Sequence, residues 1–156
     1  MLKIRILGVG KDKDRWVTDA CAHYVKLLSR YAKIDFEYVT APKTSASLTP
    51  DQIKTEEASR LMPRLGRGFS VALNDSGRRV DSRQFAALLE KWQTESGGQL
   101  TFVIGGPHGL HADIVKKADL SLSLSPLTFS HQIVRVVLLE QLYRGFSILQ
   151  GTSYHK

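Results

Sequence analysis

The feature that most constrains the fold is a repeated alternation of short apolar segments with segments of helical periodicity. Five segments have the length and apolar content of strands: Leu2–Ile6, Ile34–Tyr38, Phe69–Asn74, Leu100–Ile104 and Leu120–Leu124. Apolar residues alternate with polar ones in the first, second and last of these, as in strands with one covered face. Strands that alternate with helices indicate an α/β domain with a mainly parallel sheet flanked by helices.

Apolar residues at helical spacing predict a helix after each of these strands. The predicted helices are Asp14–Arg30, a helix that begins at Thr49–Gln52 and ends near Pro63–Gly66, Asp81–Trp92, His111–Lys117 and His131–Ile148. Thr49 with Gln52, and Asp81 with Gln84, form the pattern of a capping box, in which each side chain bonds to the other residue's backbone. The starts of these two helices are therefore well defined by the sequence.

The connecting segments are rich in residues that favour turns. Ala41–Pro50 is rich in Pro, Ser and Thr and predicts a surface loop, which we expect to be the most mobile part of the chain. Asp75–Arg78 predicts a turn, and Gly97–Gly98 ends the next helical region. Gly8–Lys11 lacks both the dinucleotide-binding fingerprint and the phosphate-loop pattern, so it predicts a plain turn that needs a flexible backbone.

Length and composition fit one globular domain over residues 1–156, with 42% hydrophobic residues to form a core. No apolar segment is long enough to cross a bilayer, and the first residues do not form the apolar stretch of a secretory signal. The one cysteine, Cys21, excludes an intrachain disulfide and a cysteine-rich zinc site, and the histidines are too scattered for a metal site. We therefore expect a metal-free protein in the cytoplasm.

The sequence contains 22 Lys and Arg residues but only 15 Asp and Glu residues, which gives a net charge of +7 with His neutral. A cationic surface attracts polyanions, and nucleic acid is the commonest polyanion in a cytosol. Charge alone fits equally a basic surface that has no such partner.

The last predicted helix, His131–Ile148, is apolar on most of its sides. A sheet covers only one stripe of a helix, so a helix of this kind needs a second partner. A second copy of the chain would supply one, and we expect a homodimer. The alternative is a monomer whose own core surrounds the helix.

Three predicted strand ends carry candidate binding residues: Leu73–Asn74, the glycine-rich Ile104–Gly109, and the hydroxyl-rich Leu124–Phe129. In open α/β sheets, ligands bind beyond the carboxyl ends of the strands, and glycine lets the backbone approach a ligand closely. The pattern fits three loops that converge on one cofactor, and it fits three ordinary turns as well.

A second group of candidates lies near the C-terminus. Glu140 and Arg144 are four residues apart on one helix face, as in a structural ion pair or in a charged pair at the rim of a pocket. The polar tail Gly151–Lys156 includes Tyr154 and His155. Such a tail is typical of a disordered terminus, although an aromatic ring beside cations also stacks on bases and contacts phosphates.

Several segments together resemble the RlmH family of SPOUT-class methyltransferases. They are Val103–Leu110, Leu122–His131, Arg135–Arg144 and Tyr154–Lys156, with Ile6–Lys11 in agreement. The resemblance covers the whole chain in length and motif order. Three positions depart from the family's usual residues: Asn74, which is often acidic, His108, often Glu or Asn, and Ser130, often Pro.

The resemblance implies a single SPOUT domain with a trefoil knot near the C-terminus, and a homodimer formed largely by the last helix. It implies S-adenosyl-L-methionine (SAM) as the cofactor and no metal. By the family match, the expected cofactor contacts are Leu73, Gly105, Leu124, Ser125, Pro126, Leu127, Thr128 and Phe129. The implied reaction is methylation of N3 of a pseudouridine in helix 69 of 23S rRNA on assembled ribosomes, with no DNA or membrane partner.

N3 of that base lies between two carbonyl groups, so methyl transfer requires removal of its proton and stabilisation of the resulting anion. The candidates are His155 as the base, Arg144 as a cation near the ring, Glu140 to orient Arg144, and Tyr154 to position or stack on the substrate base. The tail of one protomer is expected near the cofactor of the other. Alternatively, the proton leaves to solvent without a side-chain base.

Two other classes of function compete with this interpretation. One is a non-catalytic, basic α/β RNA-binding factor in ribosome assembly. The other is an enzyme that acts on a small nucleotide.

Overall fold

A five-stranded parallel sheet forms the centre of the computed structural model, which describes residues 1–43 and 47–156. The strands lie in the order β2-β1-β4-β3-β5. Their bounds are β1 (Leu2–Val9), β2 (Ala32–Val39), β3 (Phe69–Arg79), β4 (Gln99–Val103) and β5 (Leu120–Ser123). All four strand pairings are parallel, which confirms the α/β fold expected from the sequence.

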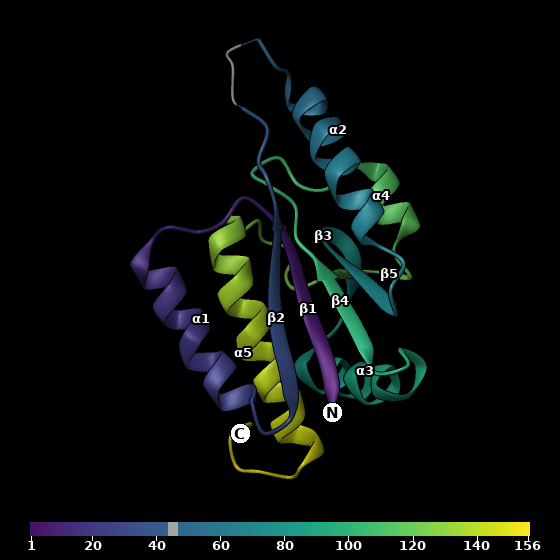
Figure 1. Ribbon diagram of the computed structural model, residues 1–156. Coiled ribbons are helices and arrows are strands. Elements are labelled where there is room, and N and C mark those ends of the chain that lie inside the picture. Colours follow the sequence, from purple (N-terminus) through teal and green to yellow (C-terminus); the bar gives the residue numbers. More distant parts are fainter. Residues whose placement is uncertain (44–46) are drawn as a thin grey trace.

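Helices cover both faces of the sheet, so the molecule has three layers (Figure 1). One face carries α1 (Arg15–Leu28), α3 (Ser82–Glu95) and α5 (His131–Leu149). The other face carries α2 (Pro50–Leu61), which continues into a 3-10 turn at Met62–Arg64, and α4 (Ala112–Lys117). No helix among residues 1–43 and 47–156 is long and apolar enough to cross a membrane.

Side chains along each strand point alternately to the two faces of the sheet, and so they contribute to a hydrophobic core on each face. Ile6 and Phe102, which are paired across β1 and β4, point into the larger core beneath α1, α3 and α5. The next pair, Leu7 and Val103, points into the smaller core beneath α2 and α4. Burial on both faces explains why these strands are short and apolar, since a parallel sheet has no solvent-facing side.

Both predicted capping boxes are present. Thr49 Oγ1 accepts a hydrogen bond from the Gln52 N–H, and Gln52 Oε1 accepts one from the Thr49 N–H. Asp81 and Gln84 do the same at the start of α3. The middle of the loop expected to be mobile, residues 44–46, lies outside the described residues.

The turn predicted at Asp75–Arg78 is wrong, because β3 continues through it to Arg79. Leu73 and Arg78 both pair with Leu122 of β5, so the intervening residues form a wide bulge in one long strand. A Cβ on Gly77 would lie 2.8 Å from the Leu122 backbone, and this close approach requires glycine. The turn-forming residues Asp75–Arg78 therefore lie in a bulge within the strand.

Helix α5 packs in the larger core in contact with both α1 and α3. Leu138, Leu139, Leu142 and Phe146 are buried within the single chain, whereas Ile133 keeps 37% of its surface exposed. The chain's own core therefore covers much of the apolar surface that led us to expect a second copy. The homodimer stays a prediction.

A buried arginine joins α5 to the loop after β1. Arg135 is fully buried, forms an ion pair with Asp12, and donates a 3.0 Å hydrogen bond to the Gly10 carbonyl. Its guanidinium lies 4.7 Å from the centre of the Tyr38 ring. A Cβ on Gly8 would lie 3.1 Å from Nη2 of Arg135, and Gly10 has a φ of +70°. The expected flexible backbone is therefore present at Gly10, whereas Gly8 lies within β1 and leaves room for the Arg135 side chain.

Replacement of Arg135 by alanine is expected to destabilise the fold by about 3 kcal/mol, because it leaves the buried Asp12 carboxylate without its charge partner. Urea unfolding measures this change. The matched control is Arg15→Ala, which removes an exposed pair with Asp19 and should change stability by less than about 0.5 kcal/mol. Equal stabilities of the two variants would contradict the anchoring role of Arg135.

Candidate functional site

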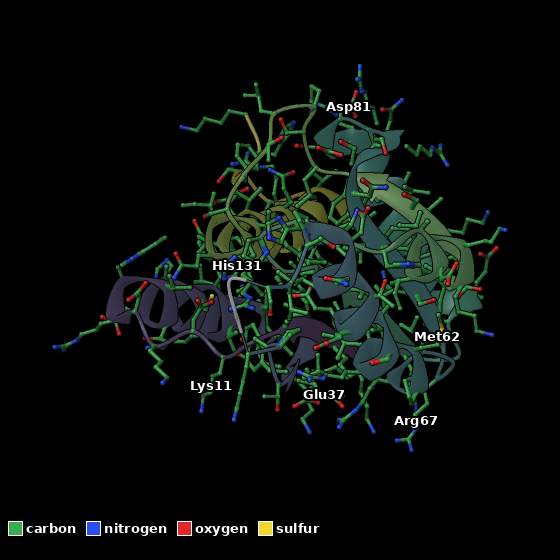
Figure 2. The ribbon with its side chains drawn as sticks, turned by 90° about the horizontal axis from the view of Figure 1, so that it is seen from above. Lys11, Glu37, Met62, Arg67, Asp81 and His131 are labelled. Carbon is green, nitrogen blue, oxygen red and sulfur yellow. The ribbon has the colours of Figure 1, made fainter. Side chains whose placement is uncertain are left out.

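A cavity of about 360 Å³ lies at the carboxyl ends of β4 and β5, beside the bulge of β3 and the first turn of α5. Residues 73–75, 104–110 and 124–129 supply most of its wall, with Lys54 from α2 and His131 and Val134 from α5. In the view from above, His131 lies toward the middle of the molecule, whereas Asp81 and Arg67 lie at its periphery (Figure 2). The three strand ends singled out in the sequence therefore converge on one site.

Most of the expected cofactor contacts line this cavity. They are Leu73, Gly105, Leu124, Ser125, Leu127, Thr128 and Phe129. The eighth, Pro126, belongs to the same loop but is not among the lining residues. The structure thus brings the set together, and the role of each residue in binding stays a prediction.

The glycine-rich loop after β4 folds tightly on itself. The Gly109 N–H donates a 3.0 Å hydrogen bond to the Gly106 carbonyl, and Gly109 has a φ of +83°. A Cβ on Gly105 would lie 2.6 Å from the Gly109 carbonyl carbon. Gly105 therefore has no room for a side chain, and backbone atoms form this wall of the cavity.

The loop after β5 is held by its own hydroxyl groups. Ser123 Oγ donates to the Ser125 carbonyl at 2.9 Å, and Ser125 Oγ accepts from the Leu127 N–H at 3.0 Å. Thr128 Oγ1 donates at 3.5 Å to Asp75 Oδ2 in the bulge of β3, which links two walls of the cavity. The serines and threonine noted in the sequence therefore shape this loop.

Charged groups at the cavity are few. Lys54 and Asp75 contribute one cation and one anion to its lining. Burial lowers the pKa of His131, and the neighbouring Arg135 charge lowers it further, against an opposing effect of Asp12. His131 is consequently held in its neutral form at the cavity end of α5.

A second group of polar residues lies at the other end of α5, and we call Glu140, Arg144, Tyr154 and His155 the C-terminal cluster. Arg144 Nη2 lies 2.6 Å from Glu140 Oε1, and Tyr154 donates a 3.1 Å hydrogen bond to the same oxygen. The Arg144 guanidinium lies 4.8 Å from the centre of the Tyr154 ring, and its Nη1 lies 3.3 Å from Nδ1 of His155. All four predicted catalytic residues are in mutual contact.

The tail is packed in this structure, in contrast to the disorder that its composition alone would favour. Tyr154 meets Tyr143 of α5 edge to face, with ring centres 4.7 Å apart. Aromatic packing and a shared carboxylate therefore hold the tail against the helix.

The cluster has a defined electrostatic state. Partial burial and the hydrogen bond to Glu140 raise the pKa of Tyr154 to about 12, so its phenol stays protonated at neutral pH. The hydrogen bonds that Arg144 donates to Glu140 raise the pKa of Arg144 and keep it cationic. Because a guanidinium only donates hydrogen bonds, Nδ1 of His155 is the accepting nitrogen in this contact.

The cavity and the C-terminal cluster lie far apart within one chain. Arg144 follows His131 by thirteen positions along α5, which corresponds to about 20 Å at the rise of an α-helix. Figure 1 shows the tail near the N-terminus, where β1 begins, at the sheet edge opposite to the carboxyl ends of the strands. A single chain therefore does not unite the two groups of predicted site residues.

Sequence reasoning missed several residues at the cavity. Asp75 lies one position beyond the strand end that was singled out, within the bulge of β3 that the sequence did not predict. His131 was noted as the start of a helix and the end of a family motif, but not as a cavity residue. Lys54 lies in the middle of α2, and nothing in its sequence context indicates a cavity.

An open parallel sheet with a glycine-lined cavity at its carboxyl edge defines a ligand-binding α/β protein. The family model described as "Predicted SPOUT methyltransferase" matches residues 2–155, and the chain belongs to that family. The resemblance inferred from the sequence is thereby confirmed.

Similar proteins support the same assignment. A protein of Acetivibrio thermocellus is 41% identical over 99% of this chain and 100% of its own length, and one of Methylobacillus flagellatus is 37% identical over 99% of each. Both are named "Ribosomal RNA large subunit methyltransferase H". Among solved structures, a probable methyltransferase of Bordetella pertussis has a TM-score of 0.55 at 16% identity, covering 91% of this chain and 95% of its own, which supports the fold alone.

The Glu140→Gln substitution is expected to lower the pKa of Tyr154 from about 12 toward the ordinary value near 10, because the carboxylate that favours the protonated phenol is neutralised. The difference between the ultraviolet pH titrations of each protein and its Tyr154→Phe counterpart measures this pKa. Glu90→Gln on the exposed surface of α3 is the control and should leave it unchanged. A Tyr154 pKa near 10 in the wild type would contradict the geometry of the cluster.

Proposed function

We propose that the protein transfers the methyl group of SAM to N3 of a pseudouridine in helix 69 of 23S rRNA, acting on assembled ribosomes in the cytoplasm. The observation that carries the proposal is the convergence of three strand-end loops on one cavity in a SPOUT methyltransferase chain. The names of the similar proteins support large-subunit ribosomal RNA as the substrate class.

The cavity has properties that suit SAM. Its volume of about 360 Å³ is within the range of small-molecule sites, and its wall combines glycine backbone with apolar side chains such as Leu124 and Phe129. Lys54 and Asp75 offer one charge of each sign, which complements the carboxylate and ammonium groups of a zwitterionic donor. When bound, SAM supplies an electrophilic methyl group on a sulfonium centre.

The C-terminal cluster suits the acceptor. Removal of the N3 proton requires a base and a group that stabilises the anion formed between the two carbonyls. His155 would take the proton once the approaching base displaces Arg144 from Nδ1, and the released guanidinium of Arg144 would stabilise the anion. Glu140 holds Arg144 in place, and Tyr154 would stack on or position the substrate base.

A homodimer would unite the two groups. Because α5 carries the cavity at one end and the cluster at the other, a two-fold axis that runs α5 of one protomer antiparallel to α5 of its partner would bring each cluster to the partner's cavity. Exposed apolar side chains near the cavity end support such a contact: Trp16 is 51% exposed, Leu127 69% and Ile133 37%. Each active site would then contain residues of both chains.

The net charge of +7 would attract the RNA phosphates, and substrate binding should weaken steeply with added salt. A small chain of this kind would gain affinity from a large folded substrate, and for that reason we favour the assembled ribosome over free RNA. We expect neither DNA nor membrane as a partner.

The proposal is tested by incubation of the purified protein with labelled SAM and ribosomes that lack the modification, followed by mapping of the labelled nucleotide. We expect one methyl group at N3 of the helix 69 pseudouridine. Absence of SAM binding by calorimetry at millimolar ligand would favour the non-catalytic ribosome-assembly factor. Methylation of free nucleotides would favour an enzyme with a small substrate.

His155→Ala and Arg144→Ala are each expected to lower turnover by about 100-fold with little change in SAM affinity, because both act on the acceptor and not on the donor. Steady-state kinetics and calorimetry separate the two effects. His23→Ala on the exposed surface of α1 is the control for loss of a histidine. Turnover at the wild-type rate in both cluster variants would remove these roles.

A further inference from the structure

A buried carboxylate in α2 lies directly behind the glycine-rich wall of the cavity. Glu57 keeps only 3% of its surface exposed, and the structure records no ion pair for it across residues 1–43 and 47–156. Burial of a carboxylate without a charge partner is unfavourable. A carboxylate at this buried position therefore indicates a function that an apolar core residue could not perform.

The carboxylate is fitted to the loop that follows β4. A Cβ on Gly106 would collide with Oε2 of Glu57, so only glycine permits this approach. The Gly106 backbone lies close enough to the carboxylate to favour its ionised form. Gly106 itself is closed onto Gly109 and lines the cavity, so Glu57 holds one end of a compact turn that forms a cavity wall.

Charged groups near Glu57 come from two sides. His108 faces it from the loop, and Arg60 faces it from one turn further along α2. Both favour the ionised carboxylate, as does the Gly106 N–H, but burial opposes them and raises the pKa of Glu57 above its ordinary value. The contact between α2 and the loop is therefore sensitive to protonation.

We propose that Glu57 is a positioning residue of the donor site, whose ionised carboxylate holds the Gly105–Gly109 loop in the shape that binds SAM. This inference rests on the proposed function, because it takes SAM as the ligand of the cavity. Glu57 acts from behind the loop and does not line the cavity itself.

The role has a consequence for pH dependence. Because its pKa is raised, Glu57 takes up a proton at a higher pH than an ordinary glutamate as a solution is acidified. Protonation removes the negative charge that lies against the Gly106 backbone. The affinity for the donor should therefore fall as the pH falls through the raised pKa of Glu57.

The test is calorimetric titration of the full-length chain with S-adenosylhomocysteine, the demethylated form of the donor, from about pH 8 down to about pH 5. Glu57→Ala should weaken binding by about tenfold at the upper end of this range, because the loop loses the carboxylate that packs against Gly106. Glu57→Gln keeps the size and an acceptor oxygen, so it should bind more tightly than the alanine variant and lose the pH dependence attributed to Glu57.

The matched control is Glu56→Gln, which changes the adjacent residue on the solvent side of α2, where Glu56 pairs with Arg60. It should keep both the affinity and the pH profile of the wild type. Urea unfolding of each variant separates loss of affinity from loss of fold.

Two outcomes would overturn the inference. If the wild type binds the ligand and both Glu57 variants match its affinity and pH profile, Glu57 is only a structural residue and the proposed function stands. If the wild type itself binds no ligand at any pH, the proposed function fails together with this inference.

Discussion

The structure depends on helix α5, which carries cavity residues in its first turn and polar residues of the C-terminal cluster further along. Its first turn closes the cavity through His131 and Val134, and its last turns carry Glu140 and Arg144. The buried Arg135 fixes the helix to the loop after β1 through Asp12 and the Gly10 carbonyl. Because a helix has a fixed rise per residue, these anchors set the distance between the two groups of site residues.

This fixed distance keeps the cavity and the C-terminal cluster apart within one chain. The carboxyl edge of a parallel sheet is the place where loops can surround a small ligand, and here glycine and hydroxyl residues leave the space open. The polar groups that could act on an acceptor are held at the opposite end of the molecule by a shared carboxylate and by aromatic contacts. In a dimer with antiparallel α5 helices, one interface would bring the cavity of each chain to the C-terminal cluster of the other.

Much of the fold could be predicted because its signals are local. The strands from Leu2 and Leu100 and the capping boxes at Thr49 and Asp81 are set by neighbouring residues alone. The bulge in β3 could not be predicted, because Asp75–Arg78 has turn chemistry and only its pairing with β5 keeps it in the sheet. The trefoil knot came from the family resemblance and stays a prediction.

The site was predictable to a similar degree. The strand-end rule pointed to Leu73, Gly105 and Leu124, because a parallel sheet gathers these positions at one edge. The contributions of Lys54 and Glu57 were hidden, because they depend on α2 packing against a loop that lies fifty residues away in the chain. The contact of Tyr154 with Tyr143 was hidden for a different reason, because it depends on the tail folding back on α5 after the helix ends.

The central claim is that each active site is built from two chains. In the most direct test, two variants are mixed, unfolded together and refolded. One is Gly105→Ala, which disrupts the cavity, and the other is Arg144→Ala, which disrupts the C-terminal cluster. Half of the dimers would be mixed and each would hold one intact site, so we expect about a quarter of the wild-type rate of ribosome methylation. A mixture no more active than its two components would contradict the claim.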